Sequence, residues 1–596
     1  MKLFPSFGEI SSKTKAAFKR FPITISWAII GTMFALLVTE SRGFNEAFYG
    51  KVILTFILGV SWLIATRFFE EQFKSDKEWL MILTIVFLFL FYWHLPSSKE
   101  DLKSTHYIRF ILYFISGHLF VFTAPFLLKW NKSAYFNYIK SVFIAIVRSL
   151  FFSMILYLGI ILALLAINHL FNIDIDGKRY FQIFIICLGV VNTWIYLSDF
   201  PKKIHSETEI NYTKAMEVLV KYILIPLVIL YLIILYAYSL KIVINWNLPK
   251  GWVSYLVIAL SFLGFSIQIL INPIQKTIDS RSIKRFYPWF YYLLLPLIAL
   301  LFVAVLRRIN EYGFTENRYF VLILAIWILG MTIYMLFSKR KKIKTFPLSL
   351  AIFGLLISVG FWSVFSVSIK SQINQLDTIF NQFESKNFQI THKEKNRFRS
   401  VIQYLENRKK LNEVAPILGF NPDVVFKNEN RWNIANKIAD TLQIKIVDSS
   451  EDINDNLNGN NYRYFNLDSY GRTFEVMGYN YFKQIQFNSS TINKYNTLRD
   501  YTFLLSNKSK TISISNENKQ LIEIISLKDF ISNLQKLPNN GNVNDDSYLT
   551  IKKSFKTFDV KIVFTNISLD KNVKARTKIT GANGYVFIKE KDEFKN

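Results

Sequence analysis

Apolar and polar positions divide the chain into two parts with different periods. Up to about residue 370, apolar runs alternate with short polar stretches. A helix of about 20 apolar residues crosses a hydrocarbon core of about 30 Å. We count eleven such runs, of which the third is short, so the pattern predicts about 11 transmembrane helices. The runs lie at 21–39, 51–68, 79–95, 107–128, 141–170, 180–199, 215–245, 252–272, 287–306, 318–338 and 346–369.

After residue 370 the chain becomes rich in Asn, Lys, Asp and Ser. Residues 371–387, 394–411, 430–442 and 527–536 have the spacing of amphipathic helices, and short alternating runs between them predict strands of a mostly antiparallel sheet. The strands are expected at 444–447, 462–466, 473–476, 481–487, 501–505, 511–514, 521–525, 548–551, 560–565 and 585–588. The fold class is therefore a polytopic α-helical membrane protein, residues 1–370, with a C-terminal soluble α+β, β-rich domain, residues 371–596.

Composition supports the membrane assignment and argues against a nucleic-acid partner. Hydrophobic residues make up 51% of the 596 residues, and charged residues only 19%. The formal net charge is +28. Residues 1–370 hold 38 Lys and Arg against 18 Asp and Glu, and residues 371–596 hold 33 against 25. Most of the excess thus lies between apolar runs, as membrane topology requires.

Loop charge predicts the orientation. With eleven spans, the N-terminus and even-numbered loops hold about 23 Lys and Arg, against about 12 in the odd-numbered loops. The largest contribution is the run 339–342. Under the positive-inside rule the N-terminus is cytoplasmic and the C-terminal domain is extracytoplasmic. We expect the protein in a bacterial inner (plasma) membrane, in contact with membrane lipids.

Polar residues within the apolar runs are candidate functional groups, because they are costly in lipid. Arg148 lies in the fifth run and Asp199 ends the sixth. Glu217 and Lys221 open the seventh at i,i+4 spacing, which lets them neutralise each other on a helix. A transporter would use such groups to bind ions. The alternative is that they extend to the cytoplasmic boundary, and the spans lack the dense acidic lining of an ion path.

Motifs for catalysis, cofactors and metals are missing from the sequence. The six histidines have no HExxH spacing, and no GxSxG motif is present. The stretch Asn454-x-Asn456-x-Asn458-Gly459 copies half of a calcium loop, but its twelfth position is Phe465 instead of Glu. We predict no catalytic residues, no cofactor and no metal site.

Three segments resemble one family. They are Leu248–Tyr255 (LPKGWVSY), Arg307–Tyr319 (RRINEYGFTENRY) and Trp362–Ser368 (WSVFSVS). They are similar to segments of the bacterial membrane-protein family called domain-of-unknown-function family 4153. The resemblance implies a multispanning half followed by a β-rich tail, and no known reaction. Gly360-Phe361-Trp362 stands where the family pattern implies Gly-Pro-Trp.

The second segment supplies a candidate cluster on the outer face: Arg307, Arg308, Glu311, Glu316 and Arg318. Arg307 and Glu311 stand four apart and should share a helix face. Thr315 should cap the next helix, with Glu316 at its positive end. Because arginines are unusual on the outer side, we expect this loop to contact the tail within residues 371–411.

Two classes of function remain open. The first is a non-enzymatic membrane protein whose extracytoplasmic domain, 371–596, binds or senses an envelope component, either a protein or a glycan. The alternative is a transporter or lipid-handling carrier, because eleven spans and prolines within helices are typical of transporters. A membrane glycosyl- or acyltransferase is weaker, since only Glu311, Glu316 and Arg318 lie close together in the sequence.

Overall fold

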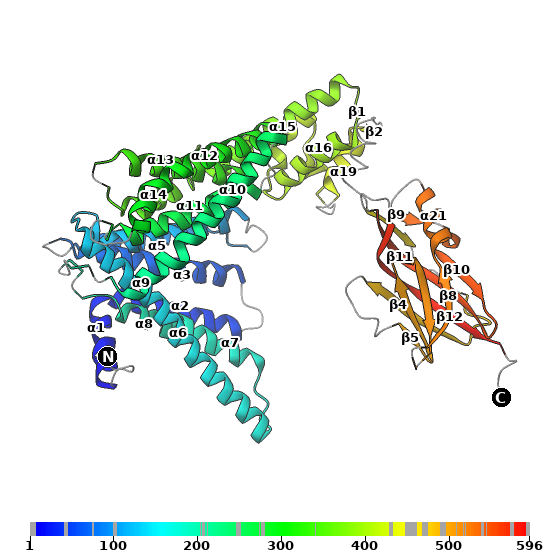
Figure 1. Cartoon of the computed structure of the whole chain (residues 1–596), viewed down its shortest axis with the longest axis horizontal. Helices are drawn as coiled ribbons and strands as arrows, with labels where there is room; N and C mark the ends of the chain where they lie inside the picture. Colours follow the sequence, from blue (N-terminus) through cyan, green and yellow to red (C-terminus); the bar gives the residue numbers. More distant parts are fainter. Residues whose placement is uncertain are drawn as a thin grey trace. The chain divides into compact units, whose positions relative to one another are not determined.

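A computed structural model gives the three-dimensional structure (Figure 1). It describes residues 7–40, 46–73, 77–98, 104–202, 204–205, 209–210, 212–245, 252–272, 274–275, 281–339, 341–427, 433–446, 462–467, 475–488, 496–507, 509–516, 518, 520–537, 541–543, 545–571 and 577–591.

The chain forms two compact units. A helical unit takes in Met1–Asn387 and Arg397–Gln443, and a β-rich unit takes in Phe388–Asn396 and Ile444–Asn596. The first unit thus extends past residue 370, where composition changes. The reason is that the helix crossing this position, α15, packs on α13 and α17 of the same unit. That residues 371–596 are soluble and extracytoplasmic stays a prediction.

The helical unit has a helix at each of the eleven apolar runs. Its helices are α1 Phe7–Arg20, α2 Pro22–Glu40, α3 Glu46–Glu70, α4 Glu78–His94, α5 Ser104–Thr123, α6 Lys132–Phe171, α7 Gly177–Ile186, α8 Thr193–Ser198, α9 Lys214–Val218, α10 Ile225–Asn245, α11 Trp252–Ile271, α12 Arg281–Tyr312, α13 Glu316–Phe337, α14 Thr345–Leu356, α15 Val364–Ser385, α16 His392–Glu406, α17 Ala415–Leu418, α18 Pro422–Val425 and α19 Ile434–Thr441. π-Helical turns join α7 to α8 and α9 to α10.

Within the described ranges, nine helices are long and apolar enough to cross a membrane. The protein is therefore a polytopic α-helical membrane protein, although the count of eleven is not confirmed. Two of the predicted spans fall short of the required length: α4 has 17 residues and α14 has 12.

The eleventh run is not one helix. The sequence predicts a span over 346–369, whereas α14 ends at Leu356 and α15 begins at Val364. Gly360, between them, has a φ of +83°, which a right-handed helix does not accept. The uniform apolarity of this segment hides the break, because apolar pattern alone does not report backbone dihedral angles.

Helix α15 continues the chain as an amphipathic helix. Its buried positions recur every three or four residues, as one face of a helix requires. They are Val364, Phe365, Ser368, Gln372, Leu376, Ile379, Phe380 and Phe383. Phe383 contacts Phe398 of α16, with ring centroids 5.6 Å apart. The sequence placed the helix start at 371, and the structure places it at 364.

The β-rich unit contains the strands that the alternating pattern predicts, with few exceptions. They are β1 Gln389–Ile390, β2 Lys445–Ile446, β3 Tyr462–Leu467, β4 Tyr481–Asn488, β5 Thr497–Leu498, β6 Tyr501–Ser506, β7 Thr511–Ser515, β8 Leu521–Ser526, β9 Gly541–Val543, β10 Thr550–Ser554, β11 Phe558–Lys571 and β12 Thr577–Glu590, with helix α21 Lys528–Lys536. β11 and β12 pair along nearly their whole length, longer than the sequence predicts.

Two larger sheets share one apolar core. One sheet has the order β4-β12-β11-β3-β9 with β10 beside β11, and the other has the order β5-β6-β7-β8. Pairing is antiparallel except for β3 with β9 and the short pair β1 with β2. Phe503 and Ile512 of the smaller sheet, Ile531 of α21, and Val563 and Val586 of the larger sheet belong to the same buried cluster. The predicted α+β, mostly antiparallel architecture is confirmed.

Some sequence-based expectations fall outside the described residues. These are Leu248–Gly251 of the first family segment, Arg340, most of the Asn454 loop, Val447, and residues 473–474. Phe465, the twelfth position of that loop, is fully buried in β3 and has no ligand atom. No strand forms at Glu475 and Val476, where the sequence predicts one.

Candidate functional site

The candidate site lies at one end of the helical unit, where three turns of the chain meet. There α4 is followed by α5, α12 by α13, and α14 by α15. Tyr319 of α13, Ile357 after α14, and Val364 and Phe365 of α15 form one buried apolar cluster that joins these turns. In the topology predicted from the sequence, this end faces away from the cytoplasm.

The loop between α12 and α13 is held by side chains of α15. Ser371 Oγ accepts a hydrogen bond of 2.8 Å from the Phe314 amide. Gln372 Nε2 donates to the carbonyl oxygens of Tyr312 at 2.9 Å and Phe314 at 2.8 Å. These bonds satisfy backbone groups that helix termini leave open. The predicted contact between this loop and residues 371–411 is therefore confirmed.

A glycine in this loop allows α15 to approach closely. Gly313 has a φ of +69°. A Cβ at this position would lie 2.7 Å from Gln375 Cγ and 2.9 Å from Ser371 Oγ. Both the backbone conformation and the space therefore require glycine.

A bidentate ion pair joins the first turn of α13 to the chain after α16. Nε and Nη2 of Arg408 donate to the two carboxylate oxygens of Glu316 at 2.7 and 2.8 Å. The two side chains are only 15% and 6% exposed, respectively. The Arg408 guanidinium also lies 3.6 Å from the centre of the Tyr404 ring. Two charges removed from water and joined by two hydrogen bonds make a strongly directional contact.

Tyr404 contributes no charge to this ion pair. Burial, and after it the Glu316 carboxylate, raises the pKa of the Tyr404 phenol well above its usual value. The phenol therefore stays neutral at physiological pH. We call the contacts of Ser371, Gln372 and Arg408 with the α12–α13 loop the clamp.

The other predicted residues of the outer-face cluster are arranged separately. Arg307 and Glu311 pair at 2.8 Å on α12, as their spacing predicts, and both side chains are 43% exposed. Arg308 is exposed, and no ion pair involving it is found in the part of the chain that the structure describes. Arg318 Nη1 donates to the carbonyl oxygens of Tyr312 at 3.1 Å and Gly313 at 2.8 Å, so it caps the end of α12.

The expected cap by Thr315 is wrong in part. Thr315 has an extended backbone at the N-cap position of α13, but its side chain makes no capping hydrogen bond. Glu316 stands in the first turn, where the helix dipole favours it. The Glu316 carboxylate pairs with Arg408, a partner that the sequence does not predict.

The break between α14 and α15 is organised by hydrogen bonds to backbone carbonyls. Trp362 Nε1 donates to the Leu356 carbonyl at 2.9 Å, and Tyr319 Oη donates to the Trp362 carbonyl at 2.6 Å. Ser363 Oγ accepts from the Ser366 amide at 3.2 Å and thus caps α15. The bend is present with Phe361 at the position where the resemblance led us to expect a proline.

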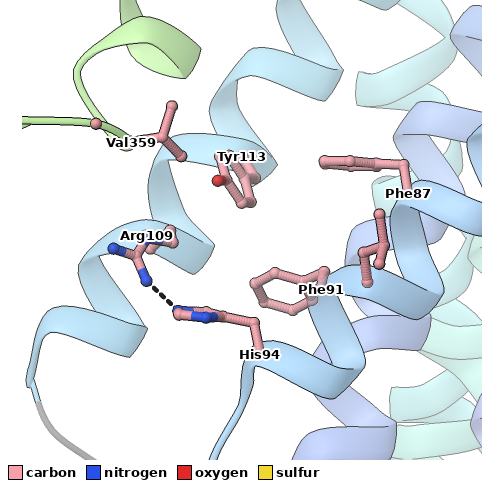
Figure 2. A pocket seen from close by; sticks show the side chains of 8 residues that line it. Phe87, Phe91, His94, Arg109, Tyr113 and Val359 are labelled. Atoms are coloured by element: carbon pink, nitrogen blue, oxygen red, sulfur yellow. Dashed lines mark hydrogen bonds between the residues drawn. The ribbon is translucent and has the colours of Figure 1, made fainter.

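A pocket of about 320 Å³ lies beside this break, between α4 and α5 (Figure 2). Its walls are mostly apolar, with a histidine and an arginine at one end. The labelled lining residues are Phe87, Phe91, His94, Arg109, Tyr113 and Val359.

Arg109 connects the pocket to the break. Its Nη1 donates to His94 Nε2, as the dashed line in Figure 2 marks. Its Nε donates to the Ser358 carbonyl at 3.2 Å, and its guanidinium lies 4.9 Å from the Phe365 ring centre. Since a guanidinium only donates, the His94 Nε2 atom must be an acceptor.

The predicted polar groups of the other spans form one pair. Arg148 Nη1 donates to Asp199 at 3.1 Å, and Lys13 lies 4.0 Å from the same carboxylate. Glu217 and Lys221, although both are described, do not pair. A π-helical turn over Leu219–Leu224 changes the register between them.

Several residues of the site were not found by sequence reasoning. Gln372 and Arg408 belong to polar stretches without a motif, so no signal marks them. Arg109 gave a signal that was missed: it is a lone cation near the start of the fourth apolar run. Among the described residues, no three His, Cys, Asp or Glu side chains lie together as metal ligands would.

Comparison with known proteins places the helical unit in a family. The chain is 24% identical over 340 residues to "Uncharacterized protein PM1469" of Pasteurella multocida (strain Pm70). The match covers 55% of this chain and 53% of that protein, so the chain spans about half the length of this relative. No solved structure gives a significant match. The family described as Domain of unknown function (DUF4153) matches residues 27–382, which run from within α2 to near the end of α15 and hence include the loop, the break and the pocket. The chain therefore belongs to the DUF4153 family of unknown function.

Proposed function

We propose that this protein is a non-enzymatic component of a bacterial inner membrane whose C-terminal β-rich unit lies outside the cytoplasm and binds an envelope component, a protein or a glycan. The excess of Lys and Arg in the even-numbered loops supports this orientation. The β-rich unit lies beyond the residues that the family match covers.

The clamp is the observation that carries this proposal. Helix α15 leaves the break at Val364, and Ser371, Gln372 and Arg408 bind it and the following segment to the α12–α13 loop. A chain that only tethered a domain would need no such fixation. These contacts lie within the helical unit, and they hold the start of the segment that leads toward the β-rich unit.

An exposed strand edge supports the binding role. β8 is the last strand of its sheet, and β7 is its only ladder partner in the described part of the chain. Leu521, Ile522 and Ile524 of β8 are exposed although they are apolar. An open edge with apolar side chains is a place where an extended partner segment can add a strand.

A reporter experiment tests the orientation. Alkaline phosphatase fused after Asn596 should be active, because this enzyme matures only outside the cytoplasm. Green fluorescence from a cytoplasm-dependent reporter at the same position would contradict the proposal. A fusion after Lys341, in the most basic loop, is the matched control and should give the opposite result.

Photo-crosslinking in cells tests the binding. A benzoylphenylalanine at Ile524 of the full-length chain should give discrete adducts with an envelope component. The same probe at Lys552, an exposed residue of β10, is the control. Adducts that are equal at both positions, or absent at Ile524, would refute binding at this edge.

The alternative of a transporter finds less support. The proline-containing helices α10 and α12 meet through buried apolar side chains of one core, among them Val228, Leu232, Leu294 and Leu297. Tyr236 Oη also donates a hydrogen bond of 2.7 Å to the Leu293 carbonyl across this contact. A transferase also finds little support, because Glu311 and Glu316 are each paired with an arginine.

A further inference from the structure

Among the described residues, the charge of Arg109 has no acidic partner. Within the described residues, the guanidinium bonds to an imidazole and a backbone carbonyl and lies over the ring of Phe365. The backbone carbonyl and the phenyl ring are uncharged, and the imidazole accepts the hydrogen bond through an unprotonated nitrogen. No ion pair involving Arg109 is found in the described part of the chain. A half-buried cation that meets no carboxylate in the described ranges favours an anionic ligand.

The pocket beside this cation is apolar. Phe87 and Phe91 of α4 and Val359 after α14 form its walls, and Arg109 and His94 lie at one end, as Figure 2 shows. Its volume of about 320 Å³ accommodates a substantial length of an acyl chain. The pocket therefore combines a site for an anion with a site for a hydrocarbon.

The surroundings of the pocket are also apolar and exposed. Leu90, which lines the pocket, is exposed, and Trp93 and Phe361, neighbours in sequence of lining residues, are exposed as well, Phe361 to 83%. In a membrane-spanning unit such side chains face lipid or its headgroup region, where tryptophan is favoured. A ligand from the bilayer can thus reach the pocket without crossing water.

From these observations we infer that the pocket binds an anionic phospholipid. The phosphate lies against the Arg109 guanidinium, and one acyl chain packs against Phe87, Leu90 and Phe91. A phosphate oxygen accepts charge-assisted hydrogen bonds from guanidinium nitrogen, so charge complementarity selects an anionic headgroup. This site is distinct from the partner-binding edge of the β-rich unit. The inference about lipid binding does not depend on the proposed function.

A lipid bound at this site would also affect the break between α14 and α15. Val359 and Gly360 line the pocket, and Arg109 holds the Ser358 carbonyl. A bound lipid would therefore contact the residues from which α15 starts. By these contacts the lipid stabilises the conformation of the segment between α14 and α15.

The test is lipid binding to the full-length chain in detergent, measured by native mass spectrometry. The probes are dioleoyl phosphatidylglycerol, dioleoyl phosphatidylcholine and oleic acid. We expect the wild-type protein to bind phosphatidylglycerol at least tenfold more tightly than phosphatidylcholine. Equal binding of the two phospholipids would overturn the inference, because it would show no selection for net negative charge.

Variants locate the binding. Arg109→Gln should weaken phosphatidylglycerol binding about tenfold to a hundredfold, the usual effect of losing hydrogen bonds to a charged group. Val359→Phe should weaken it similarly by filling the pocket while Arg109 is kept. Arg308→Gln removes an exposed arginine of the same end and should leave binding unchanged.

Two further outcomes decide the remaining questions. If Arg109→Gln does not fold, because the Ser358 carbonyl loses its donor, Val359→Phe alone decides, and unchanged affinity in that variant would overturn the site. Oleic acid that binds more tightly than phosphatidylglycerol and displaces it would identify a fatty-acid site, and the assignment to a phospholipid would then be wrong.

Discussion

The ion pair between Glu316 and Arg408 should be the strongest polar contribution to the clamp. Removing one partner leaves the other charge in a site from which water is largely excluded. Breaking a buried pair in this way costs about 3–5 kcal/mol. Because the Arg408 side chain is 15% exposed, we lower the expected cost of Arg408→Gln to about 2–4 kcal/mol. The clamp should then open more often, while the rest of the helical unit stays folded.

Hydrogen exchange of the loop amides measures this opening. The Phe314 amide donates to Ser371 Oγ at 2.8 Å, so this amide is protected while the clamp is closed. Since each 1.4 kcal/mol is a factor of ten, a cost of about 2–4 kcal/mol should speed the exchange of the Phe314 amide about 30- to 1000-fold. Amides in the middle of α13 should not change.

The chain offers a matched control for this experiment. Arg307 and Glu311 form a pair of the same chemistry near the same loop, but both side chains are 43% exposed. Exposed pairs contribute about 0–1 kcal/mol, so Arg307→Gln should change the same exchange rates less than about fivefold. In double-mutant cycles, the coupling energy of Glu316 with Arg408 should exceed that of Arg307 with Glu311 by about 1 kcal/mol or more. Equal coupling energies would refute the reasoning that burial makes the clamp strong.

Gly313→Ala should destabilise the helical unit by about 1–3 kcal/mol, as measured by unfolding in detergent, because the alanine would have to adopt a positive φ and its Cβ would meet side chains of α15. Gly330→Ala on α13 is the control: its Cβ would lie in open space, so this substitution should be neutral or stabilising. If both alanine variants have the same stability, the inference that α15 packs closely against Gly313 is wrong. Gln372→Ala removes the donor to the Phe314 carbonyl and one of the two donors to the Tyr312 carbonyl, which keeps Arg318. Limited proteolysis of the α12–α13 loop should therefore become faster, and a rate equal to wild type would argue against these two hydrogen bonds. The hydrogen bond from the Ser554 hydroxyl, and after it Lys591, lowers the pKa of Asp559 below its usual value. The ionised carboxylate therefore stabilises the β-rich unit at pH values above its unfolded-state pKa, near 4. This stabilisation is lost as the pH falls through the lower folded-state pKa. Ser554→Ala should raise the pKa of Asp559 as measured by NMR titration, and an unchanged titration curve would exclude the hydroxyl as the cause.

The general architecture could be predicted from the sequence. Each of the eleven apolar runs contains a helix, because a backbone in lipid must satisfy its own hydrogen bonds. Most strands of the β-rich unit stand where apolar and polar residues alternate, since that period exposes one face and buries the other. These are local relations, and each can be read from a window of the chain. The pair Arg307 and Glu311 is predictable for the same reason.

The break after α14 was decided by tertiary structure. Residues 346–369 are uniformly apolar, so their pattern is that of a single span. Bonds from distant groups hold the segment that follows α14: Tyr319 donates to the Trp362 carbonyl and Arg109 donates to the Ser358 carbonyl. The donors lie 43 and 249 residues away in sequence. A local pattern holds no information on such partners.

The same reason explains which candidate residues came together. The sequence identified Glu316 and expected a contact with residues 371–411, but it could not choose Arg408, which stands 92 residues away. Arg148 and Asp199 were separate candidates, and packing of α6 against α8 makes them a pair. Glu217 and Lys221 had the right spacing, and a π-helical turn separates them. Local periodicity determines that a residue faces inward or outward, whereas the rotation and depth at which helices pack determine what it meets there.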